Sequence, residues 1–356
     1  MTSERYERQV RLKGFGSAGQ QALLEASVLI VGAGGLGIPV AQYLNAMGVG
    51  QLGLMDGDVV EESNLHRQTA YGPDSIGCSK VRELARWLRS QNPDTRLEVL
   101  DTFLHTTNAL EVIRNYDLVV DATDNLTTRY LIDDACLILQ KPWIYGALHG
   151  FEGQLSVLNY EGGPTYRCLF PNPPGSGEIP DCNTMGTLGV LPGIMGNLQA
   201  LEAVKLLCGL DGVLKGQLLI YDALAQEMRH ITFQRDPRRR PPESLEEPRN
   251  TACSTDDGAI VPLVYQKVRD AGQAHILVDV REPSEFRAHH IPHAQNIPLL
   301  QLEAAWKRLE AFPEVFLICK SGPRSRQAYQ LLTNYLPGKQ IRWIQGGMRD
   351  YKVENI

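Results

Sequence analysis

The chain has 356 residues, of which 43% are hydrophobic and 21% charged, and its formal net charge is −6. This composition is typical of a globular protein, and the length exceeds that of most single domains, so we expect two domains. The negative charge gives no general attraction to nucleic acid or to an anionic membrane. No apolar run reaches the length of a membrane span, and the first residues lack a signal-peptide core. We therefore expect a cytoplasmic protein.

The first predicted unit, residues 27–56, is a strand, a glycine turn, a helix and a second strand. Gly32, Gly34 and Gly37 form the pattern G-x-G-x-x-G, which lets backbone N–H groups approach a phosphate at a helix N-terminus. Asp56 follows the second strand, where a carboxylate can bind a ribose hydroxyl. The unit predicts a nucleotide site, although the glycine pattern alone fits NAD, FAD and ATP equally well.

The rest of the first domain alternates strands and helices, which predicts an α/β fold with a Rossmann-like, doubly wound, mostly parallel sheet. Helices are expected near residues 20–24, 78–90, 126–139 and 189–207. Strands are expected at 96–100, 117–122, 143–146 and 153–159, the last as an antiparallel edge strand, with a closing hairpin at 217–221 and 228–233. In such sheets, ligands bind at the C-terminal ends of the strands.

Polar side chains gather after these predicted strands. The candidates for nucleotide binding are Asp56, Asp58, Asn64, Arg67, Gln68, Lys80, Asp124 and Asn125. Adenylation by ATP needs cations to hold the triphosphate and carboxylates to place Mg²⁺, and Arg67, Lys80 and Asp124 supply these types. Hydride transfer needs no such clamp, so the set favours ATP over NAD.

The composition changes at residues 235–259, which are rich in proline and arginine and poor in apolar residues. We interpret this segment as a linker between an adenylation domain at 1–234 and a second domain at 260–356. Strands at 276–280 and 315–318 and helices at 304–309 and 324–332 predict a small α/β domain.

Cys319 ends a predicted strand, and the chain's odd number of widely spaced cysteines argues against a disulfide framework. Loop N–H groups, the next helix and nearby cations should lower the pKa of Cys319 and stabilise a thiolate or persulfide. The candidate persulfide loop contains Lys320, Ser321, Gly322 and Arg324. Cysteine phosphatases close a longer loop with an arginine, so this tighter loop suits sulfur better. Asp279 and Arg281 are expected to brace the domain rather than react.

Seven short motifs follow one another along the first domain: RYERQ, GAGGLG, D-x-D, SNLHRQ, SKV, DATDN and YRCLFP. Over about residues 5–233 they resemble the MoeB/ThiF adenylyltransferases, relatives of the ubiquitin-activating enzymes. DVREPSEF, HIPHAQNIP, ICKSGPRS and GGM, over about residues 260–352, resemble a rhodanese domain. The resemblance implies ATP-dependent adenylation of the C-terminal glycine carboxylate of a ubiquitin-like sulfur-carrier protein that ends in Gly-Gly.

The same resemblance implies roles for individual residues. Carried over by motif, Gly34 and Gly35 approach the nucleotide, Asp56 binds ribose, Arg67 and Lys80 contact phosphates, and Asp124 binds Mg²⁺. Arg8 would reach the site of the partner subunit, since the family works as homodimers. A persulfide on Cys319, loaded by a cysteine desulfurase or by thiosulfate, would then convert the activated carrier to a thiocarboxylate.

The chain departs from the family at a structural zinc, which relatives usually hold with two C-x-x-C pairs. Thr165 stands in place of one cysteine, Cys168 remains, and the region of the second pair reads DPRRRPPE. One ligand of four cannot close a tetrahedral site, so we expect no zinc. Cys182 aligns with a cysteine that in some relatives forms a covalent link to the carrier, but an inert loop cysteine is almost as good an interpretation.

Two other functions stay open. One is an NAD-dependent oxidoreductase with an appended sulfurtransferase domain, and the other is a non-catalytic ATP-binding scaffold for sulfur carriers. The pathway also stays open, because molybdopterin, thiamine, tRNA thiolation, cysteine and siderophore synthesis all use this chemistry.

Overall fold

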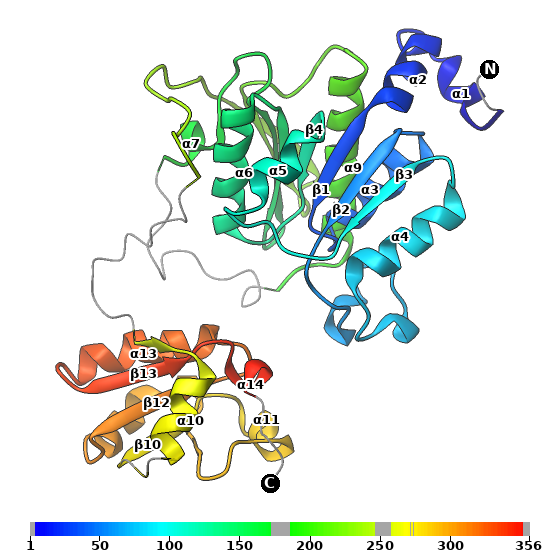
Figure 1. Cartoon of the computed structure of the whole chain (residues 1–356). Helices are drawn as coiled ribbons and strands as arrows, with labels where there is room; N and C mark the ends of the chain where they lie inside the picture. The colour runs from blue at the N-terminus through cyan, green and yellow to red at the C-terminus, as the bar shows by residue number, and fades with distance from the viewer. Residues whose placement is uncertain (1–3, 172–185, 246–257, 271, 273, 352–356) are drawn as a thin grey trace. The chain divides into compact units, whose positions relative to one another are not determined.

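The computed structural model describes residues 4–171, 186–245 and 258–351, except 271 and 273. The chain divides into two compact units, Met1–Asn250 and Thr251–Ile356 (Figure 1). None of the helices among the described residues is long and apolar enough to cross a membrane.

The first unit is built on an eight-stranded sheet in the order β3-β2-β1-β4-β5-β6-β7-β8. The strands are β1 Ser27–Val31, β2 Gln51–Met55, β3 Arg96–Leu100, β4 Leu118–Asp121, β5 Trp143–His149, β6 Glu152–Leu158, β7 Gln217–Asp222 and β8 Glu227–Thr232. Strands β3 to β5 in this order are parallel, and β6, β7 and β8 add antiparallel pairs. The predicted doubly wound, mostly parallel sheet is confirmed.

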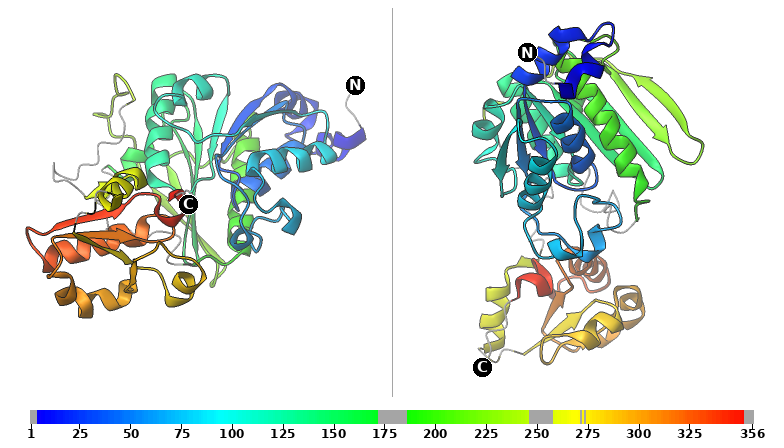
Figure 2. Two further views of the ribbon diagram at one scale, coloured as in Figure 1. Left: turned by 60° about the horizontal axis from the view of Figure 1, so that its bottom comes forward. Right: turned by 90° about the vertical axis from the view of Figure 1, so that its right-hand side faces the viewer.

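Helices cover both faces of this sheet (Figures 1 and 2). They are α1 Glu7–Val10, α2 Gly16–Glu25, α3 Gly37–Ala46, α4 Lys80–Gln91, α5 Ala109–Arg114, α6 Leu126–Leu139, α7 Tyr166–Leu169 and α9 Val190–Leu207. Val28 and Ile30 of β1 belong to one hydrophobic cluster, and Leu29 and Val31 to another. Successive strand residues point to opposite faces, so β1 is buried on both sides, which explains its continuous apolar run.

The expectation of an edge strand at 153–159 was wrong. β6 is an inner strand that pairs with β5 on one side and with β7 on the other, and the sheet ends at β8. The alternation in its sequence is that of an antiparallel strand, but the partner β7 lies far along the chain, 70 residues away in the pair Glu152↔Asp222. Local pattern does not reveal a partner at that separation.

The second unit has a five-stranded parallel sheet in the order β11-β10-β12-β13-β9. Its strands are β9 Ala259–Ile260, β10 His275–Asp279, β11 Gln295–Asn296, β12 Glu314–Ile318 and β13 Gln340–Ile344. Its helices are α10 Pro262–Asp270, α11 Pro283–Ala288, α12 Leu302–Ala305, α13 Pro323–Tyr335 and α14 Gly347–Asp350. The small α/β domain is confirmed, although the helix expected at 304–309 is a short α-helix followed by a 3₁₀ turn, Trp306–Leu309.

Candidate active sites

The glycine turn lies between β1 and α3, and its glycines have different reasons to be there. A Cβ on Gly32, whose φ is +105°, would lie 2.5 Å from the carbonyl oxygen of Ala122, and a Cβ on Gly37 would lie 1.9 Å from that of Gly32. The fold itself therefore requires these two glycines. A Cβ on Gly34 would meet only Nε2 of Gln68, at an ordinary 3.6 Å. The space beside Gly34 is open, as a bound phosphate would require.

Gly35 packs closely on the long helix α9. A Cβ there would come within 3.0 Å of the Pro192 side chain and 3.4 Å of the carbonyl oxygen of Arg67. The turn is thus held between α9 and the segment 63–68.

Asp56, directly after β2, is tied to the glycine turn. Its carboxylate oxygens accept hydrogen bonds from the backbone N–H groups of Ala33 and Asp58, each at 2.8 Å. Burial raises the pKa of Asp56, and Lys80 opposes this shift. Lys80 forms an ion pair with Asp58, with 3.0 Å between Nζ and Oδ2. Tyr71 donates to the carbonyl oxygen of Ala33, so both sides of the turn are fixed.

The segment SNLHRQ supplies a second wall beside the turn. Asn64 and Gln68 are buried, and the carbonyl oxygen of Asn64 accepts the N–H groups of Arg67 and Gln68. Arg67 donates to the carbonyl oxygen of Ser63 at 2.9 Å. Among the described residues, Oε1 of Gln68 is buried without a hydrogen-bond partner. The Gln68 side chain, whose amide nitrogen lies next to Gly34, therefore has an unused acceptor.

The loop after β4 is held by a buried ion pair. Asp121 is fully buried, and its Oδ2 lies 3.2 Å from Nε of Arg129. Arg129 also donates to the carbonyl oxygen of Thr123 at 2.8 Å, and the Thr123 hydroxyl donates to Asp121 at 2.6 Å. Burial raises the pKa of Asp121, although Arg129 opposes it. The backbone of this loop is therefore fixed from within the protein.

Asp124 and Asn125 follow on this fixed backbone. Asn125 caps α6, since its Oδ1 accepts the N–H of Thr127 at 2.9 Å. Asp124 is exposed, and it makes no hydrogen bond or ion pair to any other residue in the described ranges. Its carboxylate is free to bind a cation at the C-terminal edge of the sheet.

The N-terminal motif RYERQ is docked through its other residues and leaves Arg8 unused. The Tyr6 ring is buried, and its hydroxyl accepts a hydrogen bond from Asn92 at 3.1 Å. Gln9 donates to the carbonyl oxygen of Met47 at 3.0 Å. Arg8 is exposed and has no ion-pair partner within the part of the chain that the structure describes.

Polar contacts occupy the region where the resemblance would place zinc ligands. The Cys168 sulfur accepts the backbone N–H groups of Thr165 and Asp236, each at 3.4 Å. Arg239 and Arg167 both pair with Asp134, Arg167 at 2.7 Å. No group of three or more metal-ligating side chains occurs in the described residues. Through Asp236 and Arg239, the start of the segment 235–259 packs on the rest of the first unit, which extends to Asn250. Cys182 lies outside the described residues.

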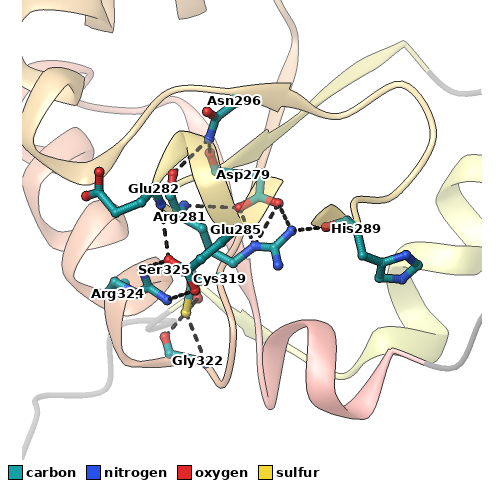
Figure 3. A network of polar contacts seen from close by, with 10 residues as sticks. All are labelled: Asp279, Arg281, Glu282, Glu285, His289, Asn296, Cys319, Gly322, Arg324 and Ser325. Atoms are coloured by element: carbon teal, nitrogen blue, oxygen red, sulfur yellow. Dashed lines mark hydrogen bonds and ion pairs between the residues drawn. The ribbon is translucent and has the colours of Figure 1, made fainter. Parts of the chain in front are cut away.

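Cys319 follows β12 in the second unit and precedes α13 (Figure 3). The residue is 1% exposed, and its sulfur accepts the backbone N–H of Gly322 at 3.1 Å and lies 3.5 Å from the Ser325 hydroxyl. The carbonyl oxygens of Cys319 and Lys320 instead accept N–H groups of the segment at 348–349. The carbonyl groups are thus turned away from the sulfur, and the N–H of Gly322 and the N-terminus of α13 face it and stabilise negative charge there.

Two arginine–carboxylate pairs surround this loop. Arg281 pairs with the fully buried Asp279 at 2.6 Å and donates to the carbonyl oxygen of His289, so the bracing role predicted for Asp279 and Arg281 is confirmed. Arg324 makes a bidentate pair with Glu285, at 2.6 and 2.9 Å. Hydrogen bonds from Arg324 lower the pKa of Glu285. Sequence reasoning missed Glu285, which lies 39 positions from Arg324.

The comparisons with known proteins agree with both units. Residues 6–241 match the ThiF family. The chain belongs to the ThiF family. Residues 262–354 match the rhodanese-like domain, so this member carries a rhodanese-like unit at its C-terminal side.

Two similar proteins align with more than nine tenths of the chain, and a similar solved structure aligns with two thirds of it. Adenylyltransferase and sulfurtransferase MOCS3-1 of Zea mays is 40% identical, over 92% of this chain and 77% of that protein. MOCS3 of Xenopus laevis is 38% identical, over 99% and 86%. The crystal structure of E. coli MccB with ATP has a TM-score of 0.59 at 19% identity, over 67% of this chain and 73% of that one. This last likeness shows the fold of the first unit.

Proposed function

We propose that this chain is an adenylyltransferase and sulfurtransferase that activates a ubiquitin-like sulfur carrier with ATP and then supplies sulfur from a persulfide on Cys319. The observation that carries the proposal is one chain with two sites. One is a strand edge with the unpaired carboxylate of Asp124, and the other is a loop whose Gly322 N–H donates to the sulfur of a buried cysteine at the N-terminus of a helix. The names of the relatives support both activities.

In the first reaction, the C-terminal carboxylate of the carrier attacks the α-phosphate of ATP. The bond to the bridging oxygen breaks, pyrophosphate leaves, and an acyl-adenylate forms. Asp56 would hold the ribose, Arg67 and Lys80 the phosphates, and Asp124 would hold Mg²⁺, which supplies positive charge that neutralises the leaving group. Gly34 leaves room for the phosphates, and the unpaired side-chain oxygen of Gln68 would accept a hydrogen bond from a hydroxyl group of the nucleotide.

In the second reaction, the terminal sulfur of the Cys319 persulfide attacks the acyl carbon and AMP leaves. The product is an acyl disulfide that joins the carrier to Cys319. A second thiolate then attacks the Cys319 sulfur, which releases the carrier as a thiocarboxylate and leaves a disulfide that a cellular dithiol reduces. We propose Cys182 for this thiolate.

The unpaired Arg8 supports a homodimer in which Arg8 reaches the nucleotide of the partner subunit. The donor of sulfur to Cys319 is a cysteine desulfurase persulfide or thiosulfate. The NAD-dependent alternative is disfavoured because the polar residues at the strand edge suit a triphosphate with a cation, and the scaffold alternative leaves the Cys319 loop without a use.

The test is mass spectrometry of a carrier ending in Gly-Gly after incubation with ATP, Mg²⁺ and a sulfur donor. The wild-type chain should produce the thiocarboxylate, and Cys319→Ala should abolish it while carrier-dependent exchange of pyrophosphate into ATP continues. Cys208→Ala, at a partly buried thiol of the first unit, is the matched control and should behave as wild type. Thiocarboxylate formation by Cys319→Ala, or a wild type without carrier-dependent exchange, would refute the proposal.

A further inference from the structure

Cations beside Cys319 are largely cancelled by carboxylates. Arg324, in the first turn of α13, is close enough to Cys319 to interact with it electrostatically, yet both of its terminal nitrogens bind the two oxygens of Glu285 (Figure 3). Arg281 likewise donates hydrogen bonds to the Asp279 carboxylate and to the carbonyl oxygen of His289. In this arrangement each guanidinium is paired with a carboxylate, so neither is an unpaired cation for a ligand.

Glu285 is held in place by its own helix. The residue lies in the first turn of α11, and its Oε2 accepts the backbone N–H of Glu282 at 3.2 Å in a capping box. A carboxylate fixed in this way keeps Arg324 in one orientation. Lys320 is the remaining cation of the loop; it is exposed and has no ion-pair partner among the described residues.

We infer that Glu285 sets the sulfur-donor preference of the Cys319 loop: by neutralising Arg324, it disfavours a free dianion such as thiosulfate and favours a persulfide that carries a single charge. The inference rests on the proposed function, because it concerns how Cys319 is loaded. A dianion needs unpaired cations at its binding site, whereas the single charge of a persulfide can be balanced by the Gly322 N–H, the N-terminus of α13 and Lys320.

Both donors would react in the same way at Cys319. The Cys319 thiolate attacks the outer sulfur of the donor, and the donor's S–S bond breaks. With thiosulfate, sulfite leaves with the electron pair; with a persulfide on another protein, that protein's cysteine thiolate leaves. In each case Cys319 gains one sulfur atom as a persulfide. Cyanide can remove this sulfur as thiocyanate, which regenerates the thiolate.

The test is steady-state transfer of sulfur from thiosulfate to cyanide by the full chain. Glu285→Gln keeps an amide oxygen for the Glu282 N–H but frees Arg324, and it should lower the KM for thiosulfate roughly fivefold, the size of a partly exposed charge interaction, with little change in kcat. The gain should shrink as salt is added. The decrease in KM should also vanish in the double variant Glu285→Gln with Arg324→Gln. A merely structural role of Glu285 would not make this decrease depend on Arg324.

Two controls separate charge from shape. Glu285→Asp keeps the carboxylate and should keep the wild-type KM, and Glu282→Gln removes a neighbouring charge that does not contact Arg324. Loading of Cys319 from the persulfide of a cysteine desulfurase should not improve in Glu285→Gln. An unchanged or higher thiosulfate KM in Glu285→Gln, or the same gain without Arg324, would overturn this inference alone. A wild-type Cys319 that takes sulfur from neither donor would overturn the proposed function as well.

Discussion

Two loops carry the proposed chemistry, and they are supported in different ways. The β4 loop, residues 122–125, and the β12 loop, residues 319–322, each follow a buried parallel strand and lead into a helix. Each is held by an arginine that binds a carboxylate. In the β4 loop the paired side chains, Arg129 and Asp121, are 9% and 0% exposed, whereas Arg324 and Glu285 beside the β12 loop are each 31% exposed.

The reacting groups show the reverse burial. Asp124 of the β4 loop is exposed on a buried support, and Cys319 of the β12 loop is buried beside a half-exposed support. A cation site needs an open carboxylate on a backbone that does not move. A persulfide needs protection from water. The charges of the Arg324–Glu285 pair beside it are partly exposed, so they can interact with an approaching sulfur donor. We conclude that the first arginine pair serves rigidity and the second serves selection.

The largest expected effect is the loss of the buried pair. Arg129→Leu leaves the Asp121 carboxylate buried without its cation and should lower the free energy of unfolding by about 3–5 kcal/mol. Arg324→Leu should cost at most about 1 kcal/mol, because water screens a half-exposed pair. Urea denaturation of the full chain, with the transition of each unit followed separately, measures both.

Arg82→Leu is the matched control in the first unit. Arg82 pairs with Asp101 at 2.7 Å but is 71% exposed, so its loss should cost about 0–1 kcal/mol. Equal losses of stability in Arg129→Leu and Arg82→Leu would contradict the claim that a buried arginine pair stabilises the fold more than an exposed one.

The pH dependence of stability should also differ between the units. Burial raises the pKa of Asp133, in α6, to about 6 from an ordinary value of 3.8. Between these values, the folded protein keeps a proton that the unfolded chain has released. The contribution of Asp133 therefore favours the fold at low pH and is lost as the pH rises through about 6. Glu285 works the other way, because its lowered pKa adds stability that is lost as the pH falls.

Asp133→Asn removes this titration. As the pH rises from about 4 to 7, the stability of the wild type relative to the variant should fall by about 2 kcal/mol, since each pKa unit corresponds to about 1.4 kcal/mol. Urea titrations at several pH values measure the difference. Relative to Glu285→Gln, the stability of the wild type should instead rise with pH, and by a smaller amount. Parallel curves for wild type and Asp133→Asn would contradict the assigned shift.

Much of this architecture was predictable from local pattern. The apolar run of β1, the glycines after it and the aspartates that end later strands predicted the sheet and the edge where Asp56 and Asp124 lie. Asp279 and Arg281 are two positions apart, so their pairing could be anticipated from their spacing. These features depend on neighbours in sequence, which is why a single chain reveals them.

The supports of the loops were not predictable, because they join residues that only the fold brings together. Arg129 was a polar position of a predicted helix with no sign of its partner, and Glu285 was one acidic residue of a motif. Arg239 belonged to a segment whose composition indicates a linker, yet it binds Asp134, more than one hundred positions earlier. Composition describes the average of a segment and does not identify the one side chain that has a partner.

The Arg239–Asp134 pair is intermediate in burial between the pairs that hold the two loops. Arg239 and Asp134 are 24% and 19% exposed, between the values for the buried and half-exposed pairs. Arg239→Ala should therefore cost about 1–2 kcal/mol, more than Arg324→Leu and less than Arg129→Leu, since Arg167 still pairs with Asp134. Arg238→Ala, whose partner Asp236 is two residues away and whose side chain is 89% exposed, is the control. If the measured costs do not rise with burial across these arginines, burial is not what distinguishes the supports of the two loops.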